Sequence, residues 1–316
     1  MSRRGWMLFA LMSVLWGIPY LMIKVAVAGV SVPVLVFVRT AIGALVLLPL
    51  ALPGGRLPEL RRHWRPLAAF AAIEIIVPWW LLADAERQLS SSMTGLLLAV
   101  SPIIAVVVAR LTGDAERLGA TRSAGLAVGL AGVLILAAPG LRGGDVRSVV
   151  EVLLVATCYA TAPLIVARRL TDVPGLPMTA VCLCLAALVY APAAVATWPD
   201  AMPSGRVVAA LAGLGIVCTA TAFVVFFALI REVGTSRALV FTYVNPAVAV
   251  GAGVLLLGEP LSAPVVASFG LILGGSVLAT ARRRQFPSGG STGPKAIPSV
   301  GSTSSSRPPR TTNATS

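Results

Sequence analysis

The sequence predicts an all-α membrane protein whose ten transmembrane helices form two inverted five-helix repeats. Three observations lead to this prediction. Apolar residues make up 57% of the 316 residues and charged residues only 12%, whereas soluble domains average about a quarter charged. The apolar residues fall into stretches long enough to cross the ~30 Å hydrocarbon layer of a bilayer. The second half of the chain also repeats motifs of the first half at a nearly constant offset.

The apolar stretches favour helices over barrel strands. Inside a bilayer every backbone polar group must be paired, which only helices and closed barrels achieve. The stretches are too long and too uniformly apolar for the alternating strands of a barrel. We therefore expect helical spans at about 6–28, 33–52, 66–86, 90–110, 120–138, 148–167, 177–197, 206–230, 236–257 and 263–281. The segment 285–316 is rich in Ser, Thr, Pro and Gly and is predicted to be a disordered cytoplasmic tail.

Arginines between the spans set the orientation. With the N-terminus inside, sixteen loop arginines lie on the inner side and four on the outer side. Positive residues are enriched in cytoplasmic loops, so both termini are predicted to be cytoplasmic in a multi-pass protein of the cell membrane. The same clustering accounts for the net charge of +13 without a nucleic-acid partner, and the lipid bilayer is the expected surrounding.

The internal repeat is the strongest organisational signal. Ser92–Pro102 aligns with Ser236–Pro246 at an offset of 144, and after one inserted residue Gly113-Asp114 aligns with Gly258-Glu259. Each half holds five spans, and an odd number forces the two copies into opposite orientations. Inverted repeats are the architecture of many secondary transporters. The predicted repeats cover 6–138 and 148–281.

Short motifs along the chain carry a family resemblance. In order they are Leu15-Trp16-Gly17 followed by Lys24, then Arg39, then Ser101-Pro102, then Asn245-Pro246 followed by Gly258-Glu259-Pro260-Leu261. With these motifs and its repeat the chain resembles the EamA-type branch of the drug/metabolite transporter superfamily. The resemblance implies two EamA repeats around a central cavity and ATP-independent transport of small metabolites. The loop after the fourth span departs from the pattern, because Gly113-Asp114 stands where Gly-Glu would be usual.

Paired prolines suggest a substrate site in the fourth and ninth spans. Pro102 cannot bond the carbonyl of Leu98, and Pro246 cannot bond that of Thr242. Interruptions at matching depths in two halves of a transporter point to the substrate site. We therefore list Ser101, Thr242 and Asn245 as candidate substrate ligands. The alternative is a pair of structural kinks packed against neighbouring helices.

The first span carries a polar stripe. Trp16, Tyr20 and Lys24 recur every four residues and would share one helix face. Aromatic rings with polar tips suit a small polar ligand. Tyr159 occupies the position that corresponds to Trp16 in the second half and joins the candidate substrate ligands. A packing seam with an interfacial lysine is the alternative interpretation.

Two charged residues, Arg39 and Glu74, lie well inside predicted spans. Arg39 is an intramembrane cation, which favours a place in the bundle interior. It is a candidate substrate ligand; the alternative is a structural ion pair with Asp84 or Glu86. Glu74 is the one acidic residue well inside a span, and it is the candidate for proton coupling. The alternative for Glu74 is a neutral, hydrogen-bonded acid without a role in transport.

Glycines four residues apart predict close helix packing. Gly125 with Gly129, and Gly270 with Gly274, match this spacing. These faces suit contacts between helices of the chain or the seam of a homodimer.

Several classes of function lack the residues they need. There is no Walker loop for ATP. His63 is the one histidine, which leaves no material for a histidine metal site or a catalytic triad, so no metal, cofactor or enzymatic activity is expected. The leading hypothesis is a secondary transporter that exports small polar metabolites, amino acids or drug-like compounds. A passive channel, a non-transporting scaffold and an intramembrane enzyme are the alternatives.

Overall fold

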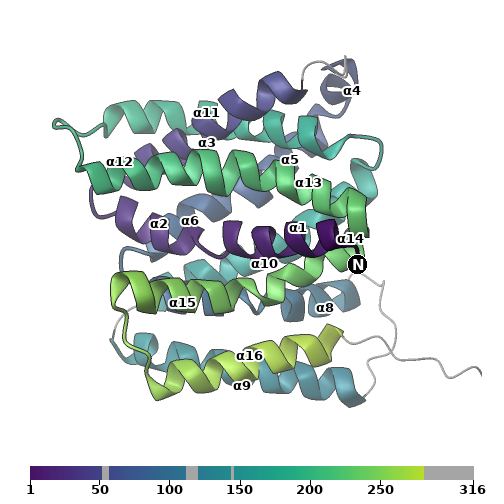
Figure 1. Ribbon diagram of the computed structural model, residues 1–316, viewed down its shortest axis with the longest axis vertical. Helices are drawn as coiled ribbons and strands as arrows, with labels where there is room; N and C mark the ends of the chain where they lie inside the picture. The colour runs from purple at the N-terminus through teal and green to yellow at the C-terminus, as the bar shows by residue number, and fades with distance from the viewer. Residues whose placement is uncertain (52–56, 112–119, 144–145, 281–316) are drawn as a thin grey trace, which may run out of the picture. The chain divides into compact units, whose positions relative to one another are not determined.

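The computed structural model describes residues 1–51, 57–111, 120–143 and 146–280, and the regular structure in these ranges is entirely helical (Figure 1). The predicted tail and the loop with Gly113-Asp114 lie outside the described residues. The elements are α1 (Arg3–Leu15), α2 (Pro19–Ala26), α3 (Val32–Ala51), α4 (Leu57–Arg62), α5 (Trp64–Ala71), η2 (Ala72–Ile76), α6 (Val77–Ala85), α7 (Ser91–Leu98), α8 (Ser101–Leu111), α9 (Ala120–Gly143), α10 (Val146–Arg169), α11 (Gly175–Ala196), α12 (Gly205–Ala212), η3 (Gly213–Thr221), α13 (Ala222–Val233), α14 (Thr235–Ala238), η4 (Leu239–Tyr243), α15 (Asn245–Leu257) and α16 (Ala263–Thr280).

These elements form the ten predicted spans. Seven helical stretches of the described residues are long and apolar enough to cross a membrane. Three shorter apolar helices, 123–138, 245–257 and 263–279, complete the set. The prediction of an all-helical membrane protein with ten spans is therefore confirmed.

The first span is interrupted, which the sequence analysis did not predict. It consists of α1 and α2, with a turn between Leu15 and Pro19. Proline has no N–H to donate to the carbonyl four residues earlier, and its ring clashes with that carbonyl. Gly17 and Ile18 both donate to Val14 O instead. The polar stripe predicted for a continuous helix is therefore divided between two helices.

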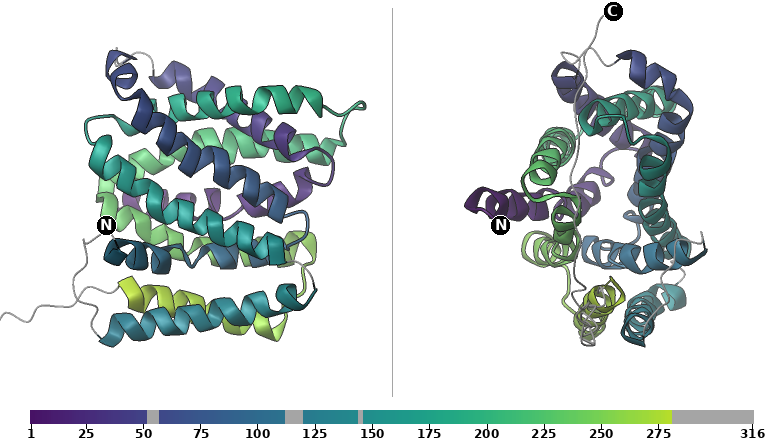
Figure 2. Two further views of the ribbon diagram at one scale, coloured as in Figure 1. Left: turned by 180° about the vertical axis from the view of Figure 1, so that it is seen from behind. Right: turned by 90° about the vertical axis from the view of Figure 1, so that its right-hand side faces the viewer.

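Corresponding elements of the two repeats pack against each other. The second span of the first repeat, α3, packs on its counterpart α11, and the fifth span, α9, packs on its counterpart α16. Figures 1 and 2 show α9 and α16 side by side from opposite directions. The remaining contacts are reciprocal, because α2 packs on α12 while α6 packs on α10. This exchange is the contact pattern of two copies related by a pseudo-two-fold axis.

The third span of each repeat contains a π-helical segment at a matching position. Adding the repeat offset of 144 to Ala72–Ile76 gives 216–220, which lies inside Gly213–Thr221. A π turn bonds residue i to i+5 and accommodates one extra residue, and such turns occur often at functional sites. Glu74 lies in the first of these segments.

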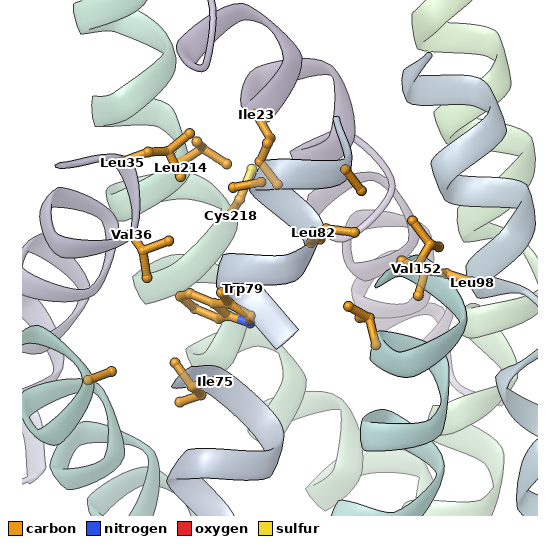
Figure 3. Packing of buried hydrophobic residues seen from close by; sticks show 14 of the residues in the cluster. Ile23, Leu35, Val36, Ile75, Trp79, Leu82, Leu98, Val152, Leu214 and Cys218 are labelled. Atoms are coloured by element: carbon orange, nitrogen blue, oxygen red, sulfur yellow. The ribbon is translucent and has the colours of Figure 1, made fainter. Parts of the chain in front are cut away.

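Apolar packing between the repeats surrounds these segments. Figure 3 shows part of the buried cluster, in which Ile75, Trp79 and Leu82 come from the third span. Leu214 and Cys218 of η3 belong to the same cluster. Side chains of both π segments therefore contribute to one buried core.

Small residues bring α9 and α16 together, with one difference from the predicted pattern. A Cβ at Gly125 or Gly129 would collide with atoms of α16 or of Ile103. On α16 the close contact is made by Gly275, whose added Cβ would meet the backbone of Gly129. Gly270 and Gly274 have open space around them, so their predicted role in packing within the chain is wrong. The helix turns Gly275, rather than Gly274, toward its neighbour.

Candidate functional site

Arg39 is held inside the bundle by contacts from two other spans. Its side chain is 6% exposed. The guanidinium carbon lies 3.6 Å from the ring centroid of Trp79, which is a close cation–π contact. Arg39 Nε donates to Thr219 Oγ1 at 3.0 Å, and Thr219 Oγ1 donates to Leu214 O at 2.7 Å. The π segment η3 thus supplies a hydroxyl that fixes the arginine.

The terminal nitrogens of this guanidinium, Nη1 and Nη2, have hydrogen-bond donors that the described residues leave unused. Within the described ranges, no residue accepts a hydrogen bond from Arg39 Nη1 or Nη2. A guanidinium edge with two nitrogens matches a carboxylate or phosphate in a bidentate geometry. Arg39 therefore presents a preformed anion-binding group.

Two tyrosines are neighbours of Arg39. Tyr20 of α2 and Tyr159 of α10 both interact electrostatically with Arg39. Tyr159 also interacts with Trp79, the ring on which Arg39 stacks. The structure thus brings together Tyr20, Arg39 and Tyr159 from three spans and both repeats. These three candidates interact electrostatically with one another, and we call them the Arg39 cluster.

Glu74 also interacts electrostatically with Tyr159 of the Arg39 cluster. It is half-buried in η2, which packs against α10 and α11. Tyr159 and Cys158 of α10 and Cys182 of α11 are its electrostatic neighbours. These neighbours come from the second repeat, so Glu74 faces protein, in agreement with the predicted interior position.

The candidate polar residues at the paired helix breaks have backbone partners. α7 ends at Leu98 and α8 begins at Ser101, while α15 begins at Asn245 after the short η4. Ser101 Oγ donates to Leu98 O at 2.6 Å, the carbonyl that Pro102 leaves free. Thr242 Oγ1 donates to Leu239 O at 2.8 Å. Both hydroxyls stabilise the breaks, and their predicted role as substrate ligands stays a prediction.

Asn245 links the break in the ninth span to the break in the first. With its amide oriented to satisfy its surroundings, Nδ2 lies 3.2 Å from Ser13 O and 3.1 Å from Phe241 O. The two chains approach closely there, because a Cβ on Gly17 would collide with Val248 of α15. Only glycine permits this crossing, so the Leu15-Trp16-Gly17 motif positions α15 directly.

Trp16 belongs to an aromatic group apart from the Arg39 cluster. Its ring centroid lies 5.0 Å from that of Phe226, 5.4 Å from Phe241 and 5.5 Å from Phe223. Tyr20 packs instead against the larger buried cluster, the one that contains Trp79 and Leu82. The break before Pro19 separates the two residues, so the structure does not bring Trp16 and Tyr20 together as one stripe.

Asp84 and Glu86 do not form the ion pair with Arg39 that was considered as an alternative. Lys24 Nζ donates to Glu86 O at 2.7 Å and to Leu89 O at 2.8 Å. Asp84 pairs with Arg147 at 2.6 Å. The alternative in which Arg39 pairs with Asp84 or Glu86 is wrong, because Arg39 stacks on an aromatic ring instead, and a delocalised, weakly hydrated guanidinium favours such a face.

Glu259 caps α7 from the opposite repeat. Its carboxylate accepts from Ser91 N at 2.7 Å, Ser92 N at 3.0 Å and Ser91 Oγ at 2.9 Å, and it also accepts from Ser92 Oγ. Burial alone would raise the pKa of Glu259, but the hydrogen bonds from Ser92 and Ser91 lower it below its ordinary value. We call the turn 86–92, held by Lys24 and Glu259, the clasp.

Sequence reasoning missed Trp79, Thr219 and the role of Glu259. The sequence does not show whether a tryptophan in an apolar span is exposed or buried. Thr219 is one of several hydroxyl residues in the spans, and nothing in the sequence distinguishes it. Glu259 carried a usable signal, since a carboxylate after α15 could cap the serines that begin the fourth span. Among the described residues no group of His, Cys, Asp and Glu could hold a metal ion.

Comparison with known proteins identifies the class. The model of the EamA-like transporter family matches residues 3–138 and 147–281. The inner membrane transporter YedA of Escherichia coli (strain K12) is 30% identical over 287 residues, covering 89% of this chain and 91% of that one. The transporter YvbV of Bacillus subtilis (strain 168) is 24% identical, covering 86% of this chain and 90% of that one. A solved crystal structure shares the fold with a TM-score of 0.64 at 21% identity, covering 90% of this chain and all of that one.

Fold, repeats and relatives together define a multi-pass membrane transporter. The two family matches coincide with the two structural repeats. The chain belongs to the EamA-like transporter family, within the drug/metabolite transporter superfamily.

Proposed function

We propose that this transporter is a secondary exporter in the plasma membrane that moves small polar metabolites, amino acids or drug-like compounds, with the Arg39 cluster as its substrate site. The observation that supports it most is a guanidinium that is buried and fixed by Trp79 and Thr219, yet whose two terminal nitrogens have no acceptor among the described residues. An intramembrane arginine is costly and needs a reason to be kept. A negatively charged group on the substrate would provide one.

The tyrosines extend the proposed site. Tyr20 and Tyr159 offer hydroxyls beside the charge, and Trp79 offers a flat wall. A ligand that places an anionic group on Arg39 and apolar atoms between the rings would use all four side chains. Ser101, Thr242 and Asn245 stabilise helix breaks, Trp16 packs in the separate aromatic group, and Lys24 holds the turn after α6. Direct contact of these five residues with substrate is proposed only in other conformations.

Glu74 is the proposed coupling residue. Glu74 and Arg39 both interact electrostatically with Tyr159, so Glu74 can respond to the charge state of that region. A carboxyl that binds a proton when the substrate leaves, and loses it when the substrate returns, would link the two fluxes. The plasma membrane location is supported by the Escherichia coli relative YedA, which is an inner membrane transporter.

The substrate site is tested by counterflow in proteoliposomes with a panel of radiolabelled amino acids and other small zwitterions. Saturable uptake is expected for the native protein, and a non-saturable flux would favour a channel. Arg39→Gln should raise the half-saturation concentration at least about tenfold, since charged hydrogen bonds contribute ~1.5–3 kcal/mol each. Arg206→Gln, at an exposed position, is the matched control. Unchanged saturation in Arg39→Gln would contradict the proposed site.

A further inference from the structure

The clasp joins the two repeats at one end of the bundle. Lys24 holds the carbonyls of Glu86 and Leu89, and Glu259 holds the first backbone amides of α7. Lys24 and the turn belong to the first repeat, whereas Glu259 follows α15 in the second repeat. Relative motion of the repeats at this end therefore has to break the hydrogen bonds of Glu259.

The side-chain carboxyl of Glu86, at the start of the clasp, takes no part in these hydrogen bonds. The side chain of Glu86 is 0% exposed, although its backbone carbonyl accepts from Lys24. Neither of its carboxylate oxygens has a hydrogen-bond partner among the residues that the structure describes. A buried carboxylate without partners is strongly disfavoured, whereas a neutral carboxyl is tolerated far better. We therefore expect the Glu86 carboxyl to be protonated when the clasp is closed.

The charged groups around Glu86 do not replace that proton. Lys24 and Arg39 lower its preference for the neutral form, but Lys24 is committed to backbone carbonyls and Arg39 to Thr219 and Trp79. Glu259 acts in the opposite direction, because it is a second carboxylate nearby.

The other neighbouring groups are also engaged or neutral. Tyr20 of α2 is an electrostatic neighbour of Glu86 and carries no charge as a phenol. α10 packs against α6 and brings Arg147, which bonds Asp84 and Glu151. No described group of α2, α3 or α10 therefore forms an ion pair with the Glu86 carboxylate.

We propose that Glu86 is a proton-binding site that keeps the clasp closed while it is protonated and opens it on losing the proton to water. Loss of the proton creates a buried negative charge next to Glu259. Separation of the repeats relieves this charge in two ways, since it admits water to Glu86 and increases the distance to Glu259. Low pH should therefore favour the closed clasp and high pH the open one.

The test measures access to Leu89, whose side chain is 2% exposed in the closed clasp. Leu89→Cys is introduced into a chain whose four native cysteines are replaced, and the protein is placed in nanodiscs, where reagents reach both faces. Maleimide labelling is followed from about pH 5 to 9, the range that spans the titration of buried carboxyls. Each rate is divided by the rate for Asp200→Cys on the same background, an exposed position that corrects for thiol ionisation.

The normalised rate should rise with pH, by up to about tenfold per pH unit for opening linked to the loss of one proton. Glu86→Gln should keep the rate low and independent of pH, because the amide mimics the protonated acid. Glu259→Gln should raise the rate at low pH by weakening the cap. Asp172→Asn, at an exposed carboxyl, is the control and should follow the parent.

A parent protein without pH dependence, or Glu86→Gln with the pH dependence of the parent, would overturn the proposal. If Glu86→Gln does not yield monodisperse protein, Glu86→Asp replaces it, and an unshifted pH midpoint would count against the role of Glu86. The measurement needs no substrate. Its outcome is therefore independent of whether the Arg39 cluster binds substrate or Glu74 couples transport.

Discussion

At the scale of single residues, the polar groups divide by whether protein atoms satisfy them. Backbone carbonyls accept hydrogen bonds from Asn245, Ser101 and Thr242. These bonds stabilise the helix breaks that proline and glycine create. Arg39 and Glu86 are buried with part of their hydrogen-bonding capacity unused. Unsatisfied capacity in an apolar environment has a cost, and a ligand or a proton removes it.

Glu74 provides a prediction at this scale. Glu74→Gln preserves the shape and hydrogen-bonding capacity of the side chain but removes its titration. If Glu74 couples transport to protons, the variant should lose accumulation of substrate against its gradient and keep downhill exchange. Both are measured in proteoliposomes with and without an imposed pH gradient. Glu232→Gln, at an exposed carboxyl, serves as the control, and continued uphill transport by Glu74→Gln would reduce Glu74 to a structural group.

The residues that matter most were only partly accessible to sequence reasoning. Arg39, Tyr20, Tyr159 and Glu74 stand out because polar groups are rare in apolar spans, and the structure places them in one region. Trp79 does not stand out, because its contact with Arg39 depends on the rotation of one span against another. The alternative of an ion pair for Arg39 rested on depth alone, which does not specify the helix face.

At the scale of elements, two of the three helix breaks that the structure shows at prolines were predicted from the sequence. The interruptions at Pro102 and Pro246 follow from the missing N–H, and the structure has them at these positions. Pro19 has the same chemistry, but its span was interpreted as continuous because the apolar run continues past it. The π segments at Ala72–Ile76 and Gly213–Thr221 were not predicted from the sequence.

The packing of α9 on α16 gives a prediction with an adjacent control. Gly275→Ala places a Cβ against the backbone of Gly129, which cannot move without separating the helices. Gly274→Ala places the same methyl group in open space. The first variant should lower the thermal unfolding temperature in detergent. The second should leave it unchanged or raise it, since alanine is favoured over glycine in a helix by about 1 kcal/mol. Equal stability of the two variants would contradict this account of the contact.

At the scale of the whole molecule, the number of spans and the repeat were predictable because both depend on composition and spacing. A stretch of about 20 apolar residues has few alternatives to a transmembrane helix. The pairing of counterparts, α3 with α11 and α9 with α16, required the structure. No pattern in one span specifies which other span it will contact.

The orientation of the molecule is the prediction at this scale. The arginine distribution puts both termini in the cytoplasm. In intact cells a membrane-impermeant maleimide should label Asp200→Cys, in the exposed turn between α11 and α12. It should not label Thr171→Cys, in the exposed turn between α10 and α11, until the membrane is made permeable. The reverse pattern would invert the topology.

The two π segments have a consequence for how this sequence can change. A π turn shifts the angular phase of a helix, so residues after it face directions that a regular helix would not give them. Trp79 follows η2, and its ring lies against the Arg39 guanidinium. Deleting one apolar residue from Ala72–Ile76 would let the π turn close into a regular α turn and leave the flanking residues near their places. The same deletion from a regular part of the span would rotate everything beyond it by about 100°. Among relatives, single-residue deletions in the third spans should therefore fall in these two segments more often than in the regular turns beside them.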